Sequence, residues 1–98
     1  MDELSFQWDK KKNQANFKKH GVYFSEASTV FYDEHSREYF DPDHSENEDR
    51  FLMLGMSQSL RVLIVSYCYR ESDKIIRIIS SRKADNNETL NYFAGGRL

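Results

Sequence analysis

The stretch RVLIVSYCYRESDKIIRIISS, residues 61–81, decides the fold. Its first part, residues 61–69, is apolar at nearly every position, as expected for a central strand that is covered on both faces. Its second part, residues 74–81, is another apolar run, and the link between the two is short enough for a hairpin. The stretch therefore predicts two antiparallel strands at the middle of a sheet.

The neighbouring segments extend this sheet. The run RFLMLGMS, residues 50–57, is joined to the stretch by the short link QSL and predicts another hairpin strand. REYF, residues 37–40, predicts a short strand, and LSFQW, residues 4–8, predicts another because apolar and polar residues alternate in it. We expect a small antiparallel sheet of about four strands.

Two helices are predicted between the first strand and the middle of the chain. Asp9 is suited to cap a helix over residues 10–19, because its carboxylate can accept the free N–H groups of the first turn. Gly21 can end that helix in the left-handed conformation. Ser25 opens a second, short helix within residues 24–33. The residues expected to be buried from these helices are Ala15, Phe17, Ala27, Val30 and Phe31.

A third helix is predicted to close the chain. Asp85, with Glu88 three positions later, resembles a capping box, and two glycines end the helix. Leu90 and Phe93 are its predicted buried residues. We expect one α+β domain over residues 1–98, with N-terminal and C-terminal helices packed on a face or an edge of the sheet.

Composition favours a compact cytoplasmic protein. The 98 residues are 39% hydrophobic and 14% aromatic, which suffices for one core. A single cysteine, Cys68, excludes an intramolecular disulfide, and its apolar surroundings predict a buried thiol. The chain has no charged-then-apolar leader and no apolar run of about 18 residues, so we expect neither secretion nor a membrane span.

Charge is divided unevenly along the chain. Residues 1–49 contain six Lys and Arg against twelve Asp and Glu, a net charge of −6, whereas residues 50–98 contain eight against four, a net charge of +4. The second half could meet an anionic partner, or either half a protein of opposite charge. Folding could equally interleave the two sets and leave no field, because distance in sequence is not distance in space.

The strand KIIRIISSR, residues 74–82, carries arginines among isoleucines. With a period of two, Arg77 points to one side of the strand and Arg82 to the other. A guanidinium on an apolar side needs a carboxylate or a phosphate, because an unpaired buried charge is costly. A structural salt bridge from Arg77 to Glu71 or Glu88 is one interpretation, and an anionic ligand is the other.

A larger set of residues favours the ligand. Arg70 ends one strand of the hairpin, and Arg77 and Arg82 belong to the next. Glu88 and Tyr92 follow directly, four residues apart on one face of the last helix. Guanidiniums suit phosphate, and a carboxylate and a phenol suffice for proton transfer in metal-free phosphodiester cleavage. The candidate site residues are Arg70, Glu71, Arg77, Arg82, Glu88 and Tyr92, with Arg61 and Lys83 nearby.

The histidines and the acidic loop offer a metal site as an alternative. The loop DPDHSENED, residues 41–49, lacks the glycine and the ligand spacing of an EF-hand, and the sequence has no HExxH motif. A solvated acidic loop is the favoured interpretation, and no metal or cofactor is predicted. The residues considered for such a site are His20, His35, His44, Asp33, Asp41, Asp43, Glu46 and Glu48.

Several motifs recur in the order found in one known family. Residues 6–33, FQWDKKKNQANFKKHGVYFSEASTVFYD, resemble the opening of BrnT-type toxins of bacterial type II toxin–antitoxin pairs. The likeness continues through residues 41–51 and residues 76–92. Ser81 and Thr89 depart from it, standing where Ala and Arg are common. The matching residues are Phe6, Trp8, Asp9, Lys12, Asn16, Lys19, His20, Gly21, Val22, Phe24, Glu26, Ala27, Glu48, Arg50, Arg77, Ile78, Ile79, Ser80, Arg82, Ala84, Glu88 and Tyr92.

The resemblance implies a small cytoplasmic endoribonuclease with a fold similar to RelE-type toxins, which inhibits translation and growth. A ribbon-helix-helix antitoxin would neutralise it, and the complex, a 2:2 heterotetramer in one expected form, would bind operator DNA through the antitoxin. Arg77 and Arg82 would then hold RNA phosphate with help from Arg70, and Glu88 or Glu71 would transfer protons. Tyr92 would position the base or the leaving group.

A second class of function fits the same residues. The chain could be a non-catalytic interaction module that acts as partner or co-repressor of a DNA-binding protein. In that case the charged halves bind a protein, and Arg77 forms a structural salt bridge. RNA cleavage and the effect of Arg77 and Arg82 substitutions distinguish the two.

Overall fold

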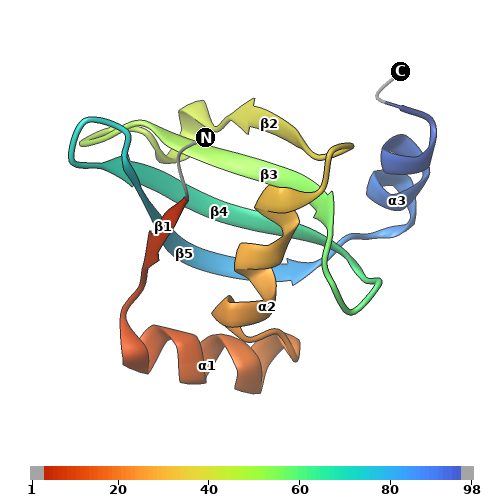
Figure 1. Cartoon of the computed structure of the whole chain (residues 1–98), viewed down its shortest axis with the longest axis horizontal. Helices are drawn as coiled ribbons and strands as arrows, with labels where there is room; N and C mark the ends of the chain where they lie inside the picture. Colours follow the sequence, from red (N-terminus) through yellow and green to blue (C-terminus); the bar gives the residue numbers. More distant parts are fainter. Residues whose placement is uncertain (1–3, 96–98) are drawn as a thin grey trace.

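The computed structural model describes residues 4–95 and shows a five-stranded sheet with helices on both of its faces (Figure 1). The α+β class is as predicted, although the sheet has five strands rather than about four. No helix within this part of the chain is long and apolar enough to span a bilayer. The elements are β1 (Ser5–Gln7), α1 (Lys10–His20), α2 (Phe24–Thr29), η1 (Val30–Tyr32), β2 (Arg37–Phe40), η2 (Pro42–His44), β3 (Arg50–Met56), β4 (Val62–Arg70), β5 (Ile75–Lys83) and α3 (Asn86–Phe93).

The sheet is mixed rather than antiparallel throughout. Its strand order is β1-β5-β4-β3-β2, and the strands β2 to β5 form an antiparallel meander. The strand β1 pairs in parallel with the start of β5, with Phe6 opposite Ile76. A parallel pair needs a long connection, which the intervening helices and hairpins supply here. The central position of β4 agrees with its nearly continuous apolar sequence.

The main core lies between the sheet and the segment α2–η1, which crosses in front of the sheet in Figure 1. We call this side of the sheet the helix face. At Gly55 of β3 a Cβ atom would stand 3.1 Å from the Val30 Cβ, so the close crossing of η1 over β3 requires glycine. The buried core residues here are Val22, Phe24, Ala27, Val30, Leu63, Val65, Tyr67, Ile76 and Ile78.

The opposite face of the sheet is covered at one end by α3. Tyr92 packs there against Leu54 and Ile64. Leu90 and Phe93, which were predicted to be buried, are 68% and 66% exposed instead. The prediction was wrong because α3 rests on the sheet through the side that carries Tyr92, so that Leu90 and Phe93 point outward.

A β-bulge in β5 changes which side chains share a face. The register between β4 and β5 shifts at Ile79, which pairs with no residue of β4. Arg77 therefore stands opposite Cys68, and Arg82 stands opposite Ile64, two residues of β4 that point to the same side. The prediction that the two arginines point to opposite sides assumed a regular strand and was wrong.

The helix α1 is fixed to the sheet by a polar side chain. Ala15 and Phe17, the predicted buried residues, are exposed, whereas Asn16 is buried. The Asn16 Nδ2 donates to the carbonyls of Val22 and Ser81, both at 2.8 Å, and its Oδ1 accepts from the Ser81 N–H at 3.0 Å. A search for apolar residues could not identify this contact.

The predicted caps of the first and last helices are confirmed. Asp9 accepts from the Lys12 N–H at 2.9 Å, and Gly21 ends α1 with a φ of 72°. Asp85 and Glu88 form a reciprocal capping box at the start of α3. The helix α2 differs from the prediction, because it begins at Phe24 with no side-chain cap and turns into the 3-10 helix η1 after six residues.

We expect Asn16→Ala to lower the free energy of unfolding by roughly 2–3 kcal/mol, because it leaves buried backbone groups of Val22 and Ser81 without partners. Gln14→Ala, at an exposed position of the same helix, is the matched control and should change stability little. Urea unfolding followed by circular dichroism measures both. Equal stability of the two variants would contradict the role given to Asn16.

Candidate functional site

One face of the sheet carries four arginines. Because residues paired across strands share a face, Arg50 of β3, Arg70 of β4, and Arg77 and Arg82 of β5 all project from the side opposite α2. We call this side, defined by these four residues, the arginine face. The side chains of Arg70 and Arg82 are each 44% exposed, so they are open to solvent.

The centre of the arginine face is a row of residues in register across four strands. Arg50 stands opposite Cys68, Cys68 opposite Arg77, and Arg77 opposite Gln7 of β1. Neighbouring strands lie about 4.8 Å apart, so the two arginines flank the cysteine closely. Cys68 itself is buried, as predicted, and burial raises the pKa of its thiol, which makes it a poor nucleophile.

Glu48 joins two of the arginines. Its carboxylate pairs with the guanidinium of Arg70, and its Oε1 lies 3.9 Å from the Arg50 Nη2. The acid comes from the loop before β3, so the acidic first half and the basic second half of the chain interleave here. The sequence motif around Glu48 and Arg50 matched the family, but the loop was interpreted as solvated, and only the strand register brings it to the site.

Glu88 is bound on both of its oxygens. Arg82 donates to Oε1 at 2.7 Å and to Oε2 at 2.9 Å, and the Asp85 N–H also donates to Oε1 at 2.8 Å. The hydrogen bonds from Arg82 lower the pKa of Glu88, and the carboxylate raises the pKa of Arg82 in return. A carboxylate held in this way is a weak proton acceptor.

Arg77 is the arginine of this face that has no acid. Its Nη1 donates to the Gln7 Oε1 at 3.1 Å, and it makes no ion pair with any residue in the range 4–95. The interpretation of Arg77 as a structural salt bridge to Glu71 or Glu88, which was the alternative to an anionic ligand, is therefore wrong. A half-buried guanidinium with only a neutral partner retains its attraction for an anion.

Glu71 lies outside the cluster. It is exposed in the turn between β4 and β5, where Glu71, Ser72 and Asp73 all have positive φ angles. The adjacent Arg70 turns to Glu48 rather than to Glu71. Glu71, a predicted proton-transfer residue, thus makes no hydrogen bond or ion pair with the arginines of this face within residues 4–95.

Tyr92 is also separate from the cluster. Its hydroxyl donates to the Asp33 Oδ2 at 2.6 Å, and the same oxygen accepts the Met56 N–H at 2.8 Å. Burial and this hydrogen bond raise the pKa of Tyr92 to about 12, and the Arg37 guanidinium lies 5.9 Å from the centre of its ring. Tyr92 therefore anchors the end of α3, while Glu88 at the start of that helix binds Arg82.

The two basic residues considered near the site lie elsewhere. Arg61 pairs with Glu26 and donates to the carbonyl of Gly21 at 3.0 Å, and its hydrogen bond lowers the pKa of Glu26. Lys83 is paired with Leu63, a residue of the helix face. Arg61 thus ties α2 to the β3–β4 turn and takes no part in the arginine face.

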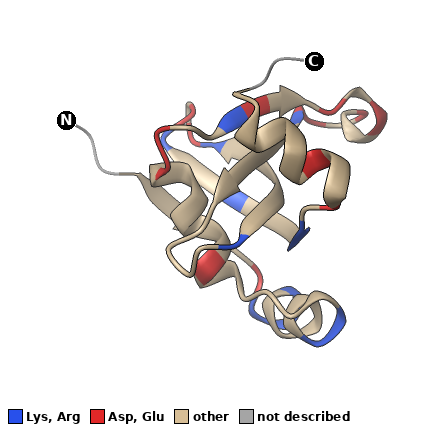
Figure 2. Ribbon diagram, turned by 90° about the vertical axis from the view of Figure 1, so that its right-hand side faces the viewer, with Lys and Arg blue, Asp and Glu red and all other residues tan. Residues whose placement is uncertain are grey.

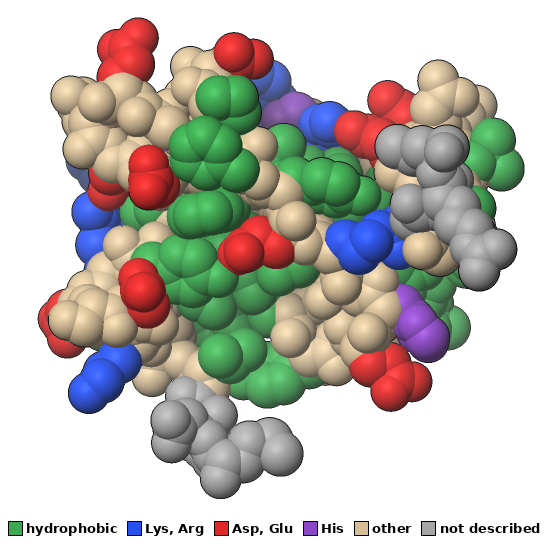
Figure 3. Space-filling model, turned by 90° about the horizontal axis from the view of Figure 1, so that it is seen from above, with side chains coloured by type: hydrophobic (Ala, Val, Ile, Leu, Met, Phe, Trp, Pro, Cys, Tyr) green, Lys and Arg blue, Asp and Glu red, His purple; other side chains and the backbone are tan. Residues whose placement is uncertain are grey.

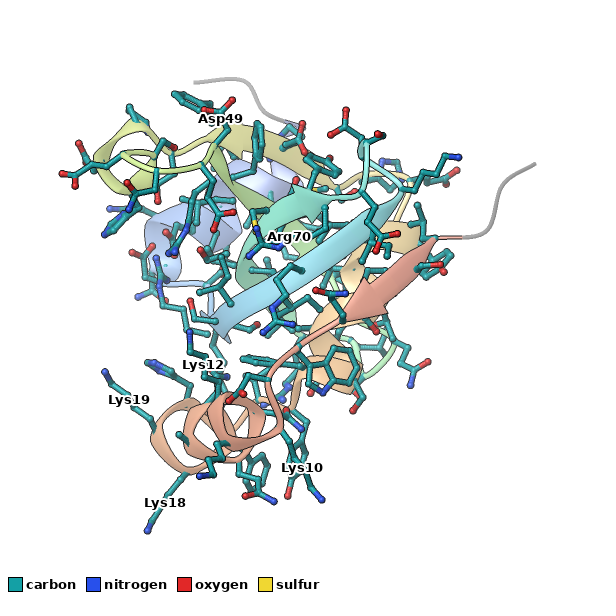
Figure 4. All side chains as sticks on the ribbon, turned by 90° about the vertical axis from the view of Figure 1, so that its left-hand side faces the viewer. Lys10, Lys12, Lys18, Lys19, Asp49 and Arg70 are labelled. Atoms are coloured by element: carbon teal, nitrogen blue, oxygen red, sulfur yellow. The ribbon has the colours of Figure 1, made fainter. Side chains whose placement is uncertain are left out.

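Lysines of α1 adjoin the arginine face near Arg82. Figure 2 shows Lys colouring over α1, and Figure 4 shows Lys12 and Lys19 on the upper side of this helix, nearer the sheet than Lys18. Lys12 and Lys19 flank Asn16 at helical spacings of four and three, and Asn16 touches the end of β5. This arrangement extends the positive charge beyond the sheet.

The histidines and acids do not gather as metal ligands within residues 4–95. No group of three or more His, Cys, Asp or Glu side chains there is arranged to hold a metal ion. His44 pairs with Asp41 at 2.9 Å, and His35 lies 3.6 Å from Glu34, both at the surface.

Fold and site together define a small α+β protein whose open sheet face is suited to phosphate groups. Comparison of the sequence with family models identifies the family: the model of the ribonuclease toxin BrnT of type II toxin–antitoxin systems matches residues 8–88. The chain therefore belongs to the BrnT family of ribonuclease toxins, as the sequence motifs predicted.

The fold has a solved counterpart. A crystal structure of the Brucella abortus ribonuclease toxin BrnT matches with a TM-score of 0.64 and 21% sequence identity. The match covers 86% of this chain and 100% of that one, which confirms the fold. No curated protein matched the sequence.

Replacing Glu88 by Gln tests the Arg82–Glu88 pair. A lowered pKa means that the charge of Glu88 stabilises the fold above its ordinary value of about 4.3, and that this contribution is lost as the pH falls below that value. At pH 7 Glu88→Gln should lower the free energy of unfolding by up to about 1 kcal/mol, because the pair is partly exposed. The amide can still accept from Asp85.

The measurement is urea unfolding of both proteins between pH 7 and pH 3.5. The difference should shrink toward the acid end, whereas Glu34→Gln, at a position 88% exposed, should show no such trend. A loss that stays constant over this range would show that the charge of Glu88 is not responsible.

Proposed function

We propose that this chain is an endoribonuclease toxin that cleaves RNA on the arginine face without a metal ion. The observation that carries the proposal is Arg77, which has no carboxylate partner among residues 4–95 and stands between two arginines that have one. A phosphate is the anion that a guanidinium fork binds best in this setting. Membership of a ribonuclease family supports RNA as the source of that phosphate.

The dimensions of the arginine face suit a single RNA strand. Arg77 and Arg82 stand opposite residues of β4 that are four apart, which corresponds to roughly 13 Å along the strand. Ser66 and Ser80 are paired between them on the same face and offer hydroxyl groups to the RNA backbone. Lys12 and Lys19 of α1, on the two sides of Asn16, continue the positive surface at the Arg82 end of β5.

The ion pairs on this face can exchange carboxylate for phosphate. Arg70 and Arg82 are exposed, and exposed pairs of this kind contribute only about 0–1 kcal/mol. A phosphate that carries full charge can therefore replace Glu48 or Glu88 at small cost. In the absence of RNA the carboxylates keep the guanidiniums oriented.

The chemistry follows from this exchange. The 2′-hydroxyl of the RNA loses its proton to a carboxylate and attacks the adjacent phosphorus, while Arg77 and Arg82 neutralise the phosphate oxygens and Arg70 assists. The bond to the 5′-oxygen breaks and that oxygen takes up a proton, which leaves a 2′,3′-cyclic phosphate and a 5′-hydroxyl. We assign the proton acceptor to Glu48 rather than to Glu88 or Glu71.

Position supports the choice of Glu48. Its charge acts on the thiol of Cys68, and Cys68 is the cross-strand neighbour of Arg77, so the carboxylate lies close to the open guanidinium. Glu88 is held on both oxygens, and Glu71 lies in the exposed turn. Tyr92 keeps α3 in place and does not contact the substrate in this proposal.

The partners and the setting follow from the family and from the resemblance in sequence. We propose that residues 1–98 act as one toxin domain in the cytoplasm, that cleavage inhibits translation and growth, and that an antitoxin with a ribbon-helix-helix region neutralises it. The antitoxin would carry the complex, a 2:2 heterotetramer, to operator DNA. Membership of a family of type II toxin–antitoxin systems supports the antitoxin as a partner.

Purified, antitoxin-free protein should cleave RNA in the presence of excess EDTA and leave 2′,3′-cyclic phosphate ends. Gel electrophoresis and end-group analysis of the fragments measure both. Cleavage that stops in EDTA and returns with Mg²⁺ would contradict metal independence. Intact RNA after incubation with folded protein would contradict the nuclease and favour an interaction module.

Arg77→Ala should lower kcat/KM for RNA by about 100- to 1000-fold, because it removes a charge that faces the developing phosphate charge. Arg77→Lys should restore part of the rate, since an ammonium keeps the charge but not the bidentate geometry. Lys18→Ala is the control. Lys18 points away from the sheet (Figure 4), so this variant should cleave RNA at the wild-type rate. Undiminished cleavage by a folded Arg77→Ala protein would remove the central argument.

A further inference from the structure

The helix face of the sheet presents a second surface of opposite character. Five residues from three adjacent strands meet there: Glu38 and Phe40 of β2, Phe51 of β3, and Tyr67 and Tyr69 of β4. We call this set the acidic aromatic surface. Seen from above, hydrophobic side chains run across the middle of the molecule with acidic side chains beside them (Figure 3).

The rings are packed into a continuous group. Phe40 and Phe51 have ring centres 5.7 Å apart, Phe51 and Tyr69 5.3 Å, and Tyr67 and Tyr69 5.6 Å. Phe40, at the outer end, is 52% exposed. Tyr67, at the inner end, is buried in the core, so the exposed part of the group is its outer end at Phe40, where an apolar patch rimmed by polar residues marks a potential contact with another molecule.

A carboxylate stands among these rings. Glu38 is an exposed residue of the edge strand β2. Its Oε2 accepts hydrogen bonds from the hydroxyls of both Tyr67 and Tyr69. The pair of phenols fixes the carboxylate in place, and the residue as a whole remains exposed. Ring faces and a fixed carboxylate together attract a cation.

The surroundings add negative charge. Asp49 and Asp73 line a neighbouring hollow of about 380 Å³ together with Phe51 and Tyr69, and Glu48, which also pairs with Arg70, borders the same hollow at the sheet's end. A polyanion such as RNA would be repelled here, whereas the arginine face attracts it. The two faces of the sheet therefore suit ligands of opposite charge.

We propose that the acidic aromatic surface binds a lysine or arginine side chain of the antitoxin, seated on Glu38 and flanked by apolar residues that cover Phe40 and Phe51. The proposal rests on the proposed function, in which an antitoxin is the partner. Charge complementarity selects this occupant, because the surface combines a fixed carboxylate with ring faces. The strand β2 is the last in the sheet order, so a partner segment can approach this surface from the side.

The docked segment lies on the opposite side of the sheet from Arg77. Substitutions in the acidic aromatic surface should therefore weaken antitoxin binding and leave RNA cleavage unchanged. This separation makes the inference testable apart from the proposed function.

The test measures the Kd of the antitoxin, the protein that neutralises this toxin when the two are co-expressed, by isothermal titration. Glu38→Gln and Phe40→Ala should each raise the Kd at least about 10-fold. Glu38→Gln should also make the Kd less dependent on the salt concentration. The matched controls are Glu34→Gln and Phe17→Ala, an acid and a ring exposed elsewhere, which should bind like the wild type. Circular dichroism confirms that each variant is folded.

Several outcomes would overturn the inference. If both surface variants bind the antitoxin like the wild type, the surface is not its docking site, although the proposed function stands. If they lose RNA cleavage, the surface belongs to the catalytic machinery. If sedimentation shows a wild-type dimer that Phe40→Ala converts to a monomer, the occupant is a second copy of this chain. If the wild-type protein neither cleaves RNA nor binds an antitoxin, the proposed function fails and the inference with it.

Discussion

A side-chain amide that takes the place of a β-strand holds this structure together. The strand β1 pairs with β5 only over Ser5–Gln7, and beyond it Asn16 of α1 exchanges two hydrogen bonds with the main chain of Ser81. The same amide donates to the carbonyl of Val22, so helix, loop and sheet edge are fixed as one unit. The part of β5 that carries Arg82 depends on this contact.

The arginines of the open face are held ready by weak partners. Glu48 and Glu88 pair with three of them, and both carboxylates come from segments outside the strands that carry the arginines. Such pairs limit the repulsion between neighbouring guanidiniums and still leave the guanidiniums able to bind another anion, because exposed ion pairs contribute little free energy. Arg77, whose side-chain partner within the described part of the chain is the neutral Gln7, is the position at which an incoming phosphate meets the least competition.

Local signals predicted the elements, and long-range pairing decided the rest. Caps at Asp9 and Asp85 and the apolar run of β4 were readable because each acts within a few residues. The burial of Asn16 could not be predicted from the sequence, because a polar residue is buried only where hydrogen-bond partners from distant segments meet it. The grouping of Glu48 with Arg70 likewise depends on strand register, and the family likeness, rather than spacing, carried the functional prediction.

The bulge at Ile79 has a consequence for chain length. Arg82 lies five positions after Arg77, and in a regular strand an odd spacing would place the two side chains on opposite sides. The bulged residue Ile79 is not counted in the alternation, so the two side chains share one side. A relative shortened by this single residue would present both guanidiniums on one side without any irregularity. A straightened strand of unchanged length would instead turn Arg82 toward Leu63 and leave Arg77 alone. The number of residues between the two arginines therefore shows whether they share a face only when it is known whether the strand contains a bulge.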